Sequence, residues 1–310
     1  MTAAVLSLQL TIFLLVIVGF LVRRFGLVGE QGQKNLNDLV LNVILPCNIF
    51  TAFLSGSADK IFGEYGFVLL ISLGIQIFCV FYGKLVFRKE LESKRKCLEY
   101  ATICSNSGFL GNPVAEGMYG AEGLILASVY LIPLRVMMWS TGLPIFTGVK
   151  DRKLLVKKVA THPCIIACVL GIIFMVAGWT LPQSLMKSLG YLGSCNTAMS
   201  MLVIGMILSQ IDLRHLWDPA VLKYSLHRLV IIPAVVLLLC YFLPISKAAL
   251  NVCVILAAMP AGATTSILAE KYGMEPEFCT KLVIFFYIAQ FAEYSSVEYT
   301  PSGDMNSALR

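Results

Sequence analysis

Residues 104–113 read Cys-Ser-Asn-Ser-Gly-Phe-Leu-Gly-Asn-Pro and interrupt an apolar stretch that runs from Leu98 to Met118. Proline lacks the amide donor that an α-helix needs, and glycine permits backbone angles that other residues avoid. The sequence therefore predicts a helix that is broken near its centre. In a membrane, the freed backbone groups must bond within the protein or line a water-filled cavity.

A second apolar stretch, from Ala248 to Ala269, has a comparable interruption at residues 259–266, which read Met-Pro-Ala-Gly-Ala-Thr-Thr-Ser. Similar short fragments follow the two breaks, Tyr-Gly-Ala-Glu at 119–122 and Tyr-Gly-Met-Glu at 272–275. Interrupted spans at matching positions of two halves are typical of the substrate site of a secondary transporter. The alternative is a pair of ordinary kinks, in which Asn and Thr side chains bond to neighbouring helices.

The rest of the chain has the composition of an integral membrane protein. Of its 310 residues, 58% are hydrophobic and 14% are charged, and the mean hydropathy is +0.81. These values lie outside the usual balance of a soluble domain. Because each crossing needs roughly 20 mostly apolar residues, we predict an all-α integral membrane fold of ten transmembrane helices. The predicted spans are Val5–Val22, Leu36–Leu54, Tyr65–Val86, Leu98–Met118, Leu124–Thr147, Ala160–Trp179, Leu189–Leu208, Val221–Leu243, Ala248–Ala269 and Leu282–Ala292.

Lysine and arginine concentrate in alternate connections between these spans. Cytoplasmic loops are enriched in both residues. With the N-terminus outside, the inner side receives the basic residues of 23–34, 84–96, 150–158, 214–228 and 271–281. The outer side receives only Lys60, Lys187, Lys247 and Arg310. We therefore expect a multi-pass protein of the cell membrane with both termini extracytoplasmic, in contact with anionic lipid and without a nucleic-acid partner.

The basic segment 150–159 divides the chain into two predicted repeats, 1–149 and 160–293. Five spans in each repeat force the second to enter the membrane with the opposite orientation, which makes an inverted repeat. The tenth apolar run, 282–292, is short for a crossing and leads into a polar tail at 294–310. We interpret this end as truncated or frame-shifted, or as an unusual variant.

Several motifs resemble the auxin efflux carrier family, which includes plant auxin carriers and bacterial permeases. Residues 106–120 are similar to the family's fourth-helix crossover, and 45–50, 138–140 and 258–273 to its second, fifth and ninth helices. The resemblance extends to about Phe285 and implies that the two broken helices cross in an X, with substrate bound beside the crossing. It is also compatible with a homodimer. Asn106, Pro113 and Pro260 match the crossover motif, whereas Asn112 stands where the pattern has an apolar residue.

The half-helices expected at the breaks suit an anionic substrate, because a helix N-terminus offers free amide groups and a positive dipole end. Together with the resemblance to organic-acid permeases, this favours a small organic anion, either a malate-like carboxylate or an auxin-like acid. The candidate substrate-binding residues are Asn48, Asn106, Asn112, Pro113, Arg135, Pro260, Thr264 and Thr265.

Arg135 lies inside a predicted span, where an arginine costs about 2.5 to 3.5 kcal/mol on insertion scales. Its guanidinium could clamp a substrate carboxylate with two hydrogen bonds. A structural pair with Glu116, or snorkelling along a kink near Pro133, explains it equally well. Glu116 and Asp38 are candidates for carrying a coupling proton.

Known catalytic motifs are missing from the sequence. It has only three histidines, His162, His215 and His227, and no G-x-S-x-G, H-E-x-x-H or Walker motif. We expect a transporter driven by a gradient or potential, with neither cofactor nor metal. The alternative is a membrane-embedded enzyme or receptor without transport activity. The sequence does not choose the substrate, the coupling ion or the direction of transport.

Overall fold

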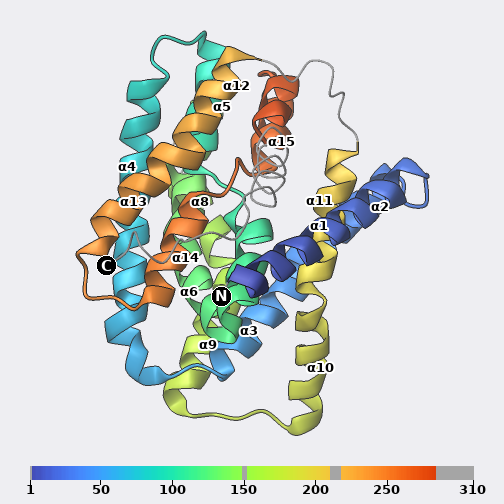
Figure 1. Cartoon of the computed structure of the whole chain (residues 1–310), viewed down its shortest axis with the longest axis vertical. Helices are drawn as coiled ribbons and strands as arrows, with labels where there is room; N and C mark the ends of the chain where they lie inside the picture. The colour runs from blue at the N-terminus through green and yellow to red at the C-terminus, as the bar shows by residue number, and fades with distance from the viewer. Residues whose placement is uncertain (1, 149–151, 210–217, 284–310) are drawn as a thin grey trace.

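The computed structural model describes residues 2–148, 152–209 and 218–283, and within them nearly all regular structure is helical (Figure 1). Six helical stretches of the described chain are long and apolar enough to cross a bilayer. They are Ser7–Arg24, Glu30–Leu54, Gly63–Val86, Ser107–Thr147, Gln183–Leu208 and Pro219–Tyr241, and two shorter apolar helices are Pro163–Ala177 and Lys247–Ala257. The prediction of an all-helical membrane protein is therefore confirmed.

The first half of the chain forms long helices that contain π-helical turns. Its α-helices are α1 (Thr2–Arg24), α2 (Glu30–Leu39), α3 (Leu45–Leu54), α4 (Gly66–Val86), α5 (Glu92–Ile103), α6 (Asn112–Met137) and α7 (Leu143–Thr147). The π-helical turns are Val40–Ile44, Ile61–Tyr65, Ser107–Gly111 and Met138–Gly142, and one 3-10 turn spans Ala58–Lys60.

The second half is built in the same way. Its α-helices are α8 (Arg152–Ala160), α9 (Pro163–Ala177), α10 (Gln183–Ser194), α11 (Asn196–Leu208), α12 (Pro219–Leu226), α13 (Ile232–Tyr241), α14 (Lys247–Ala257) and α15 (Thr264–Lys271). A π-helical turn, His227–Ile231, joins α12 to α13. Residues 276–283 are helical as well. Most of the predicted tenth span, and the polar tail after it, lie outside the described residues.

The stretch Ser107–Thr147 consists of two helices with a reversal at Gly120. A single straight helix of this length would measure about 60 Å, twice the hydrocarbon core of a bilayer. Gly120 instead has φ 61° and ψ −147°, angles that glycine adopts readily. The chain then folds back tightly, because a Cβ atom added to Gly123 would lie 2.1 Å from the carbonyl oxygen of Ala115. The reversal falls between the fourth and fifth predicted spans.

Helices α1, α2 and α11 form an arm that extends from the main bundle (Figure 1). Within it, α1 and α11 touch through their backbones at two glycines. A Cβ atom on Gly205 would lie 2.0 Å from the carbonyl oxygen of Val16, and one on Gly19 would lie 2.2 Å from that of Leu202. Small residues permit this close approach between membrane helices.

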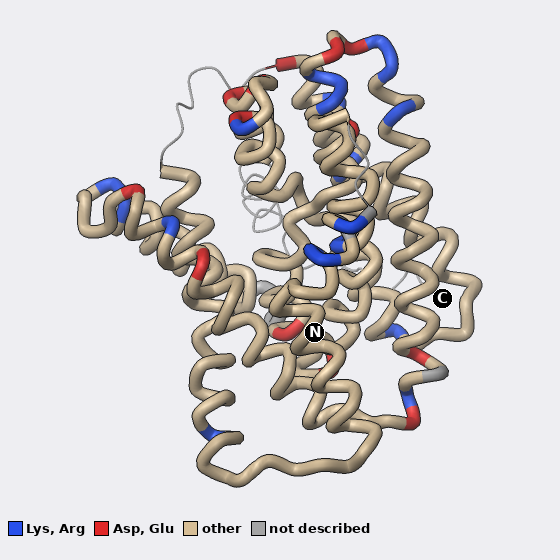
Figure 2. Tube along the Cα trace, turned by 180° about the vertical axis from the view of Figure 1, so that it is seen from behind, with Lys and Arg blue, Asp and Glu red and all other residues tan. Residues whose placement is uncertain are grey.

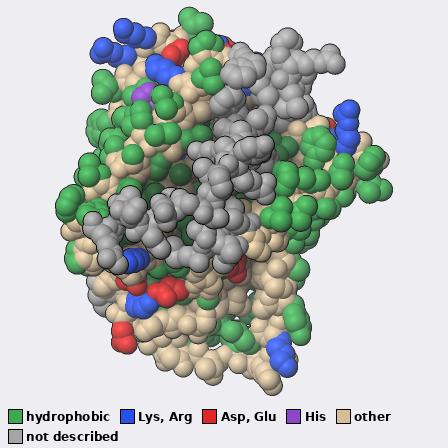
Figure 3. Space-filling view, viewed as in Figure 1, with side chains coloured by type: hydrophobic (Ala, Val, Ile, Leu, Met, Phe, Trp, Pro, Cys, Tyr) green, Lys and Arg blue, Asp and Glu red, His purple; other side chains and the backbone are tan. Residues whose placement is uncertain are grey.

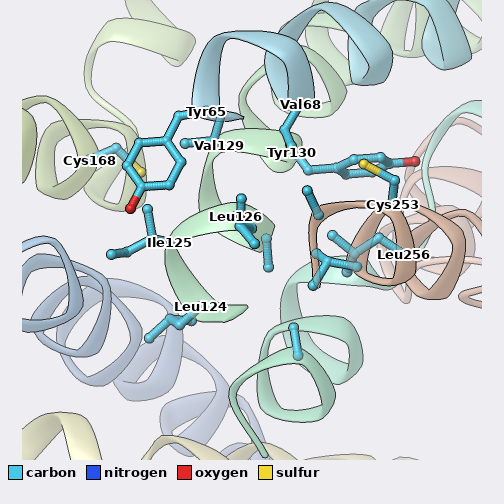
Figure 4. Close-up of a cluster of buried hydrophobic side chains, with 14 of the residues drawn as sticks. Tyr65, Val68, Leu124, Ile125, Leu126, Val129, Tyr130, Cys168, Cys253 and Leu256 are labelled. Atoms are coloured by element: carbon cyan, nitrogen blue, oxygen red, sulfur yellow. The ribbon is translucent and has the colours of Figure 1, made fainter. Parts of the chain in front are cut away.

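A hydrophobic cluster in the main bundle joins α3, α4, α6, α9, α13 and α14. Figure 4 shows part of it, with Tyr130 of α6 beside Cys253 and Leu256 of α14. The hydroxyl of Ser72 in α4 donates to the backbone carbonyl of Tyr130 at 2.5 Å. This packing surrounds the second half of α6 and fixes α14, whose end leads into the second break.

The outer surface is apolar over large areas. Exposed hydrophobic side chains on α4 and α13 include Leu70, Phe81 and Leu238, and green side chains also cover much of the arm (Figure 3). Charged residues gather at the arm's tip and at the bundle end where α4 connects to α5 (Figure 2). A largely apolar outer surface suits a protein that is surrounded by lipid.

Candidate substrate site at the meeting of two broken helices

The two breaks predicted from the sequence lie side by side. The first follows α5 and the second follows α14. Their unwound segments pair through a short antiparallel bridge between Ser105 and Ala261. The Asn106 N–H donates to the carbonyl of Pro260 at 2.8 Å. Each break thus supplies hydrogen-bond partners for backbone groups of the other, which have no water to bond to in the hydrocarbon core of a membrane.

Further contacts hold the two breaks close together. The Gly262 N–H donates to the carbonyl of Cys104 at 2.9 Å, and the Ser107 hydroxyl donates to the carbonyl of Leu256 at 2.9 Å. At Gly111 an added Cβ atom would lie 2.3 Å from a methyl carbon of Leu256, so a larger residue would require the Leu256 side chain to shift. Glycine and serine therefore permit close packing here as well as unwinding of the helices.

Two buried polar side chains beside the breaks have atoms without partners among the described residues. Asn112 is fully buried, and both its Oδ1 and its Nδ2 lack a hydrogen bond. Thr265, also fully buried, has an Oγ1 with no partner. Buried polar groups are normally hydrogen-bonded. Both residues therefore offer unused hydrogen-bonding capacity to a bound polar group.

The other candidate substrate-binding residues of the two interrupted motifs also lie at the breaks. Asn106 and Pro260 are buried and belong to the paired segments, and Pro113 is buried at the start of α6. Thr264 is exposed at the start of α15, where its Oγ1 accepts a hydrogen bond of 3.3 Å from the Tyr100 hydroxyl. The structure therefore brings the residues of the two interrupted motifs to one region.

Asn48 connects this region to the helix Glu30–Leu54. Its Nδ2 donates to Oε2 of Glu116 at 2.9 Å, although the two residues are 68 positions apart. Asn48 is buried, Glu116 is half-buried, and α10 packs against Asn48 through Gly193. The other coupling candidate, Asp38, lies on the exposed surface of α2.

Arg135 is 6% exposed near the end of α6. Its Nη1 has no hydrogen-bond partner within the described part of the chain. The alternative pairing with Glu116 does not occur among the described residues, where that carboxylate instead accepts a hydrogen bond from Asn48. Arg135 is thus a buried cation with a free donor.

Sequence reasoning missed Arg228, which it counted as a basic residue of the inner side. The structure places it within the helical stretch Pro219–Tyr241, where it is 3% exposed. Its Nε donates to the carbonyl of Met259 at 2.8 Å, and its Nη1 donates to that of Thr102 at 3.1 Å. The sequence feature that could have singled out Arg228 is its position inside the predicted span 221–243.

A polar cluster outside the membrane spans ties α5 to α12 and to the residues before 276. Lys94 pairs with Asp218 at 2.7 Å, and Ser93 donates to Glu275 at 2.7 Å. Burial works to raise the pKa of Asp218, but hydrogen bonds from Lys94 and from the Ala220 N–H outweigh it and leave that pKa below its usual value. The hydrogen bond to Asp218 raises the pKa of Lys94.

The described residues contain no group of three or more His, Cys, Asp or Glu side chains that could hold a metal ion. What they do contain is a set of apolar helices in which two interrupted segments meet, an arrangement typical of secondary transporters. The fold and the site thus define a multi-pass membrane transporter.

Comparison with known proteins identifies the family. The family model described as membrane transport protein matches residues 4–156 and 149–292. The chain belongs to this family, that of the auxin efflux carriers.

The relatives found include transporters from archaea and a plant. An uncharacterised transporter of Methanothermobacter thermautotrophicus is 30% identical over 286 residues, which cover 88% of this chain and 91% of the relative. A second, from Methanocaldococcus jannaschii, is 28% identical and covers 86% and 89%. Auxin efflux carrier component 8 of Arabidopsis thaliana is 27% identical over 134 residues, 42% of this chain and 36% of that protein. These names point to a transporter rather than an enzyme.

Proposed function

We propose that this protein is a secondary transporter that moves small organic anions across the cell membrane by alternating access. The observation that carries the proposal is the pairing of the two broken helices beside Asn112 and Thr265, whose buried polar atoms lack partners. A site of this kind supplies hydrogen bonds to a ligand in surroundings from which lipid and bulk water are excluded.

An anion fits this site better than a cation or a neutral molecule. Two helical segments have their N-termini at the breaks, one at Ser107 and one at Thr264. Helix N-termini attract negative charge. The Asn112 amide and the Thr265 hydroxyl add donors. Asn106, Pro113 and Pro260 shape the unwound segments, and Thr264 lies at their edge. The cargo we propose is a malate-like carboxylate or an auxin-like acid.

Three further candidates have supporting roles in this proposal. Asn48 positions Glu116, which belongs to the first half of α6, and Glu116 is the better candidate for a coupling proton because it is half-buried and hydrogen-bonded. Asp38 is the weaker candidate because water reaches it freely. Arg135, with its free Nη1, contacts the substrate carboxylate at some stage of the transport cycle.

We further propose ten transmembrane helices in two inverted repeats, residues 1–149 and 160–293, joined by the basic linker 150–159. Gly120 and Gly273 support this proposal, because each follows a tyrosine after a broken helix and each has a positive φ, 61° and 65°. Both termini then face the outside, and the family likeness suggests assembly as a homodimer.

Counterflow uptake of labelled organic acids into liposomes tests the proposal. We expect the wild type to accumulate at least one carboxylate, and Asn112→Leu to reduce its uptake about tenfold or more through the loss of a buried hydrogen bond to a charged ligand. Ser128→Ala is the matched control, since the bond found for the buried Ser128 hydroxyl among the described residues lies within its own helix, to the carbonyl of Leu124. A folded wild type that takes up no acid, or full activity in Asn112→Leu, would contradict the proposal.

A further inference from the structure

A single buried cation connects the ends of the two helices that precede the breaks. The Arg228 guanidinium donates to Thr102 in the last turn of α5 and to Met259 just after α14. A helix C-terminus leaves its last four carbonyl groups without helical partners and carries the negative end of the helix dipole. In transporters with broken helices, such carbonyls coordinate the coupling Na⁺ or H⁺.

The carbonyls at the end of α5 accept hydrogen bonds from other parts of the protein. The carbonyl of Ala101 accepts from the Tyr224 hydroxyl at 3.1 Å, and that of Thr102 accepts from Arg228 at 3.1 Å. Beyond the helix end, the carbonyl of Cys104 accepts from the Gly262 N–H. Three carbonyls at this end, those of Ala101, Thr102 and Cys104, therefore already have a donor from another part of the protein.

The end of α14 is covered in the same way. The carbonyl of Leu256 accepts from the Ser107 hydroxyl, that of Met259 from Arg228 at 2.8 Å, and that of Pro260 from the Asn106 N–H. Thus, among the described residues, the charged donor found at both helix ends is the same guanidinium.

We propose that Arg228 is the fixed counter-cation of the two helix ends, in the place where a coupling metal ion would otherwise bind, so that the breaks hold an anion without Na⁺. Arg228 is a positioning residue, because it acts on the substrate through the helices it holds and through its charge. The claim that the breaks hold an anion rests on the proposed function. The claim that Arg228 takes the place of a metal ion does not depend on it.

A purely structural role for Arg228 makes a different prediction. If the guanidinium only stabilises the fold, Arg228→Met weakens the protein equally in every salt. If it takes the place of a metal ion, the variant uncovers carbonyls that Na⁺ can then bind. Binding to the folded state raises the melting temperature with ligand concentration.

The experiment measures the Tm of the purified protein in detergent while NaCl replaces choline chloride at constant ionic strength. The variants are Arg228→Met, Arg228→Lys and, as a neutral control at the same helix end, Tyr224→Phe. We expect the Tm of the wild type, Arg228→Lys and Tyr224→Phe to be the same in both salts. We expect Na⁺ to raise the Tm of Arg228→Met by roughly 3 °C or more.

Two results would overturn the inference: a Tm of the wild type that rises with Na⁺, or a folded Arg228→Met whose Tm is the same in both salts. Should Arg228→Met fail to fold, ²²Na⁺ binding to the wild type decides, because saturable binding overturns the inference and its absence supports it.

Uptake by the wild type should change less than about twofold when Na⁺ is replaced, and a tenfold loss overturns the inference. A wild type that transports no acid refutes the proposed function, while the Tm comparison still tests Arg228.

Discussion

In the proposed function, Asn112 serves a ligand at the expense of stability. Its side-chain amide is fully buried with neither polar atom bonded in the described part of the structure. A buried group left without a partner costs about 1–3 kcal/mol. The buried, unbonded amide of Asn112 therefore carries a specific cost, which supports the proposed use in binding.

A stability measurement on Asn112→Leu follows from this cost. Because leucine has the same number of side-chain heavy atoms as asparagine and no polar atoms, we expect the variant to unfold at the same or a higher temperature than the wild type, with no ligand present. Thermal unfolding in detergent checks this. A Tm lowered by several degrees would mean that the amide has a structural partner.

Glu116 permits a separate test of proton coupling. Glu116→Gln keeps a carbonyl oxygen that can accept the hydrogen bond from Asn48 but cannot release a proton in the working pH range. We expect the variant to lose uptake driven by a pH gradient and to keep counterflow, which needs no net proton movement. Asp38→Asn, at an exposed position, is the control and should keep both activities. Equal loss of both activities in Glu116→Gln would assign the residue to substrate binding or folding.

At the scale of helices, the arm depends on backbone contact between α1 and α11. The contact requires glycine at position 205, where a Cβ atom would lie 2.0 Å from the Val16 carbonyl oxygen. We expect Gly205→Val to destabilise the protein by about 1–3 kcal/mol or more, as overpacking does. Gly190→Val is the control, because nothing lies within 4 Å of its Cβ position. Chemical denaturation of both variants measures the difference, and equal stability would contradict the described packing.

The pairing of Lys94 with Asp218 joins α5 to α12 and has a definite pH dependence. Because the pKa of Asp218 in the folded protein lies below its unfolded value of about 3.9, its stabilising effect is present above that pH and is lost as pH falls through the lower, folded value. At pH 7 we expect Asp218→Asn to cost at most about 1 kcal/mol, since the pair is partly exposed.

The expected cost of Asp218→Asn should shrink as the pH falls below about 3.9 toward 3. Melting temperatures of the wild type and the variant between pH 3 and pH 7 test this. Glu30→Gln is the control, because Glu30 pairs with Lys34 on an exposed surface and should have little effect at any pH. A difference that is independent of pH would mean that the charge of Asp218 does not contribute.

For the whole molecule, the distribution of basic residues predicts which surfaces face the outside. The variants Lys60→Cys and Lys187→Cys should react with a membrane-impermeant maleimide in intact cells. Lys34→Cys and Lys89→Cys should react only after permeabilisation. The wild type measures the background, since Cys195 is exposed and most other cysteines are buried. The reverse labelling pattern would show that the predicted orientation is wrong.

Much of the architecture could be read from the sequence because its causes are local. Long apolar runs predict membrane helices, and Gly, Pro and Asn predict the breaks at 104–113 and 259–266, since these residues act on the backbone where they stand. The resemblance implied that the breaks meet, and the bridge between Ser105 and Ala261 agrees with it.

The partners of buried polar groups depend on which helices pack together, and so only the tertiary structure decided them. Arg228 looks like one more basic residue in a charge count, yet its guanidinium bonds to Thr102 and Met259, far from it in the sequence. The bond between Asn48 and Glu116 spans 68 positions and leaves Arg135 without the partner that the sequence offered it. Hydropathy and backbone preference select the helices and their breaks, whereas the carbonyls freed at those breaks and the half-buried carboxylate of Glu116 bond to whichever donors the packing brings within reach.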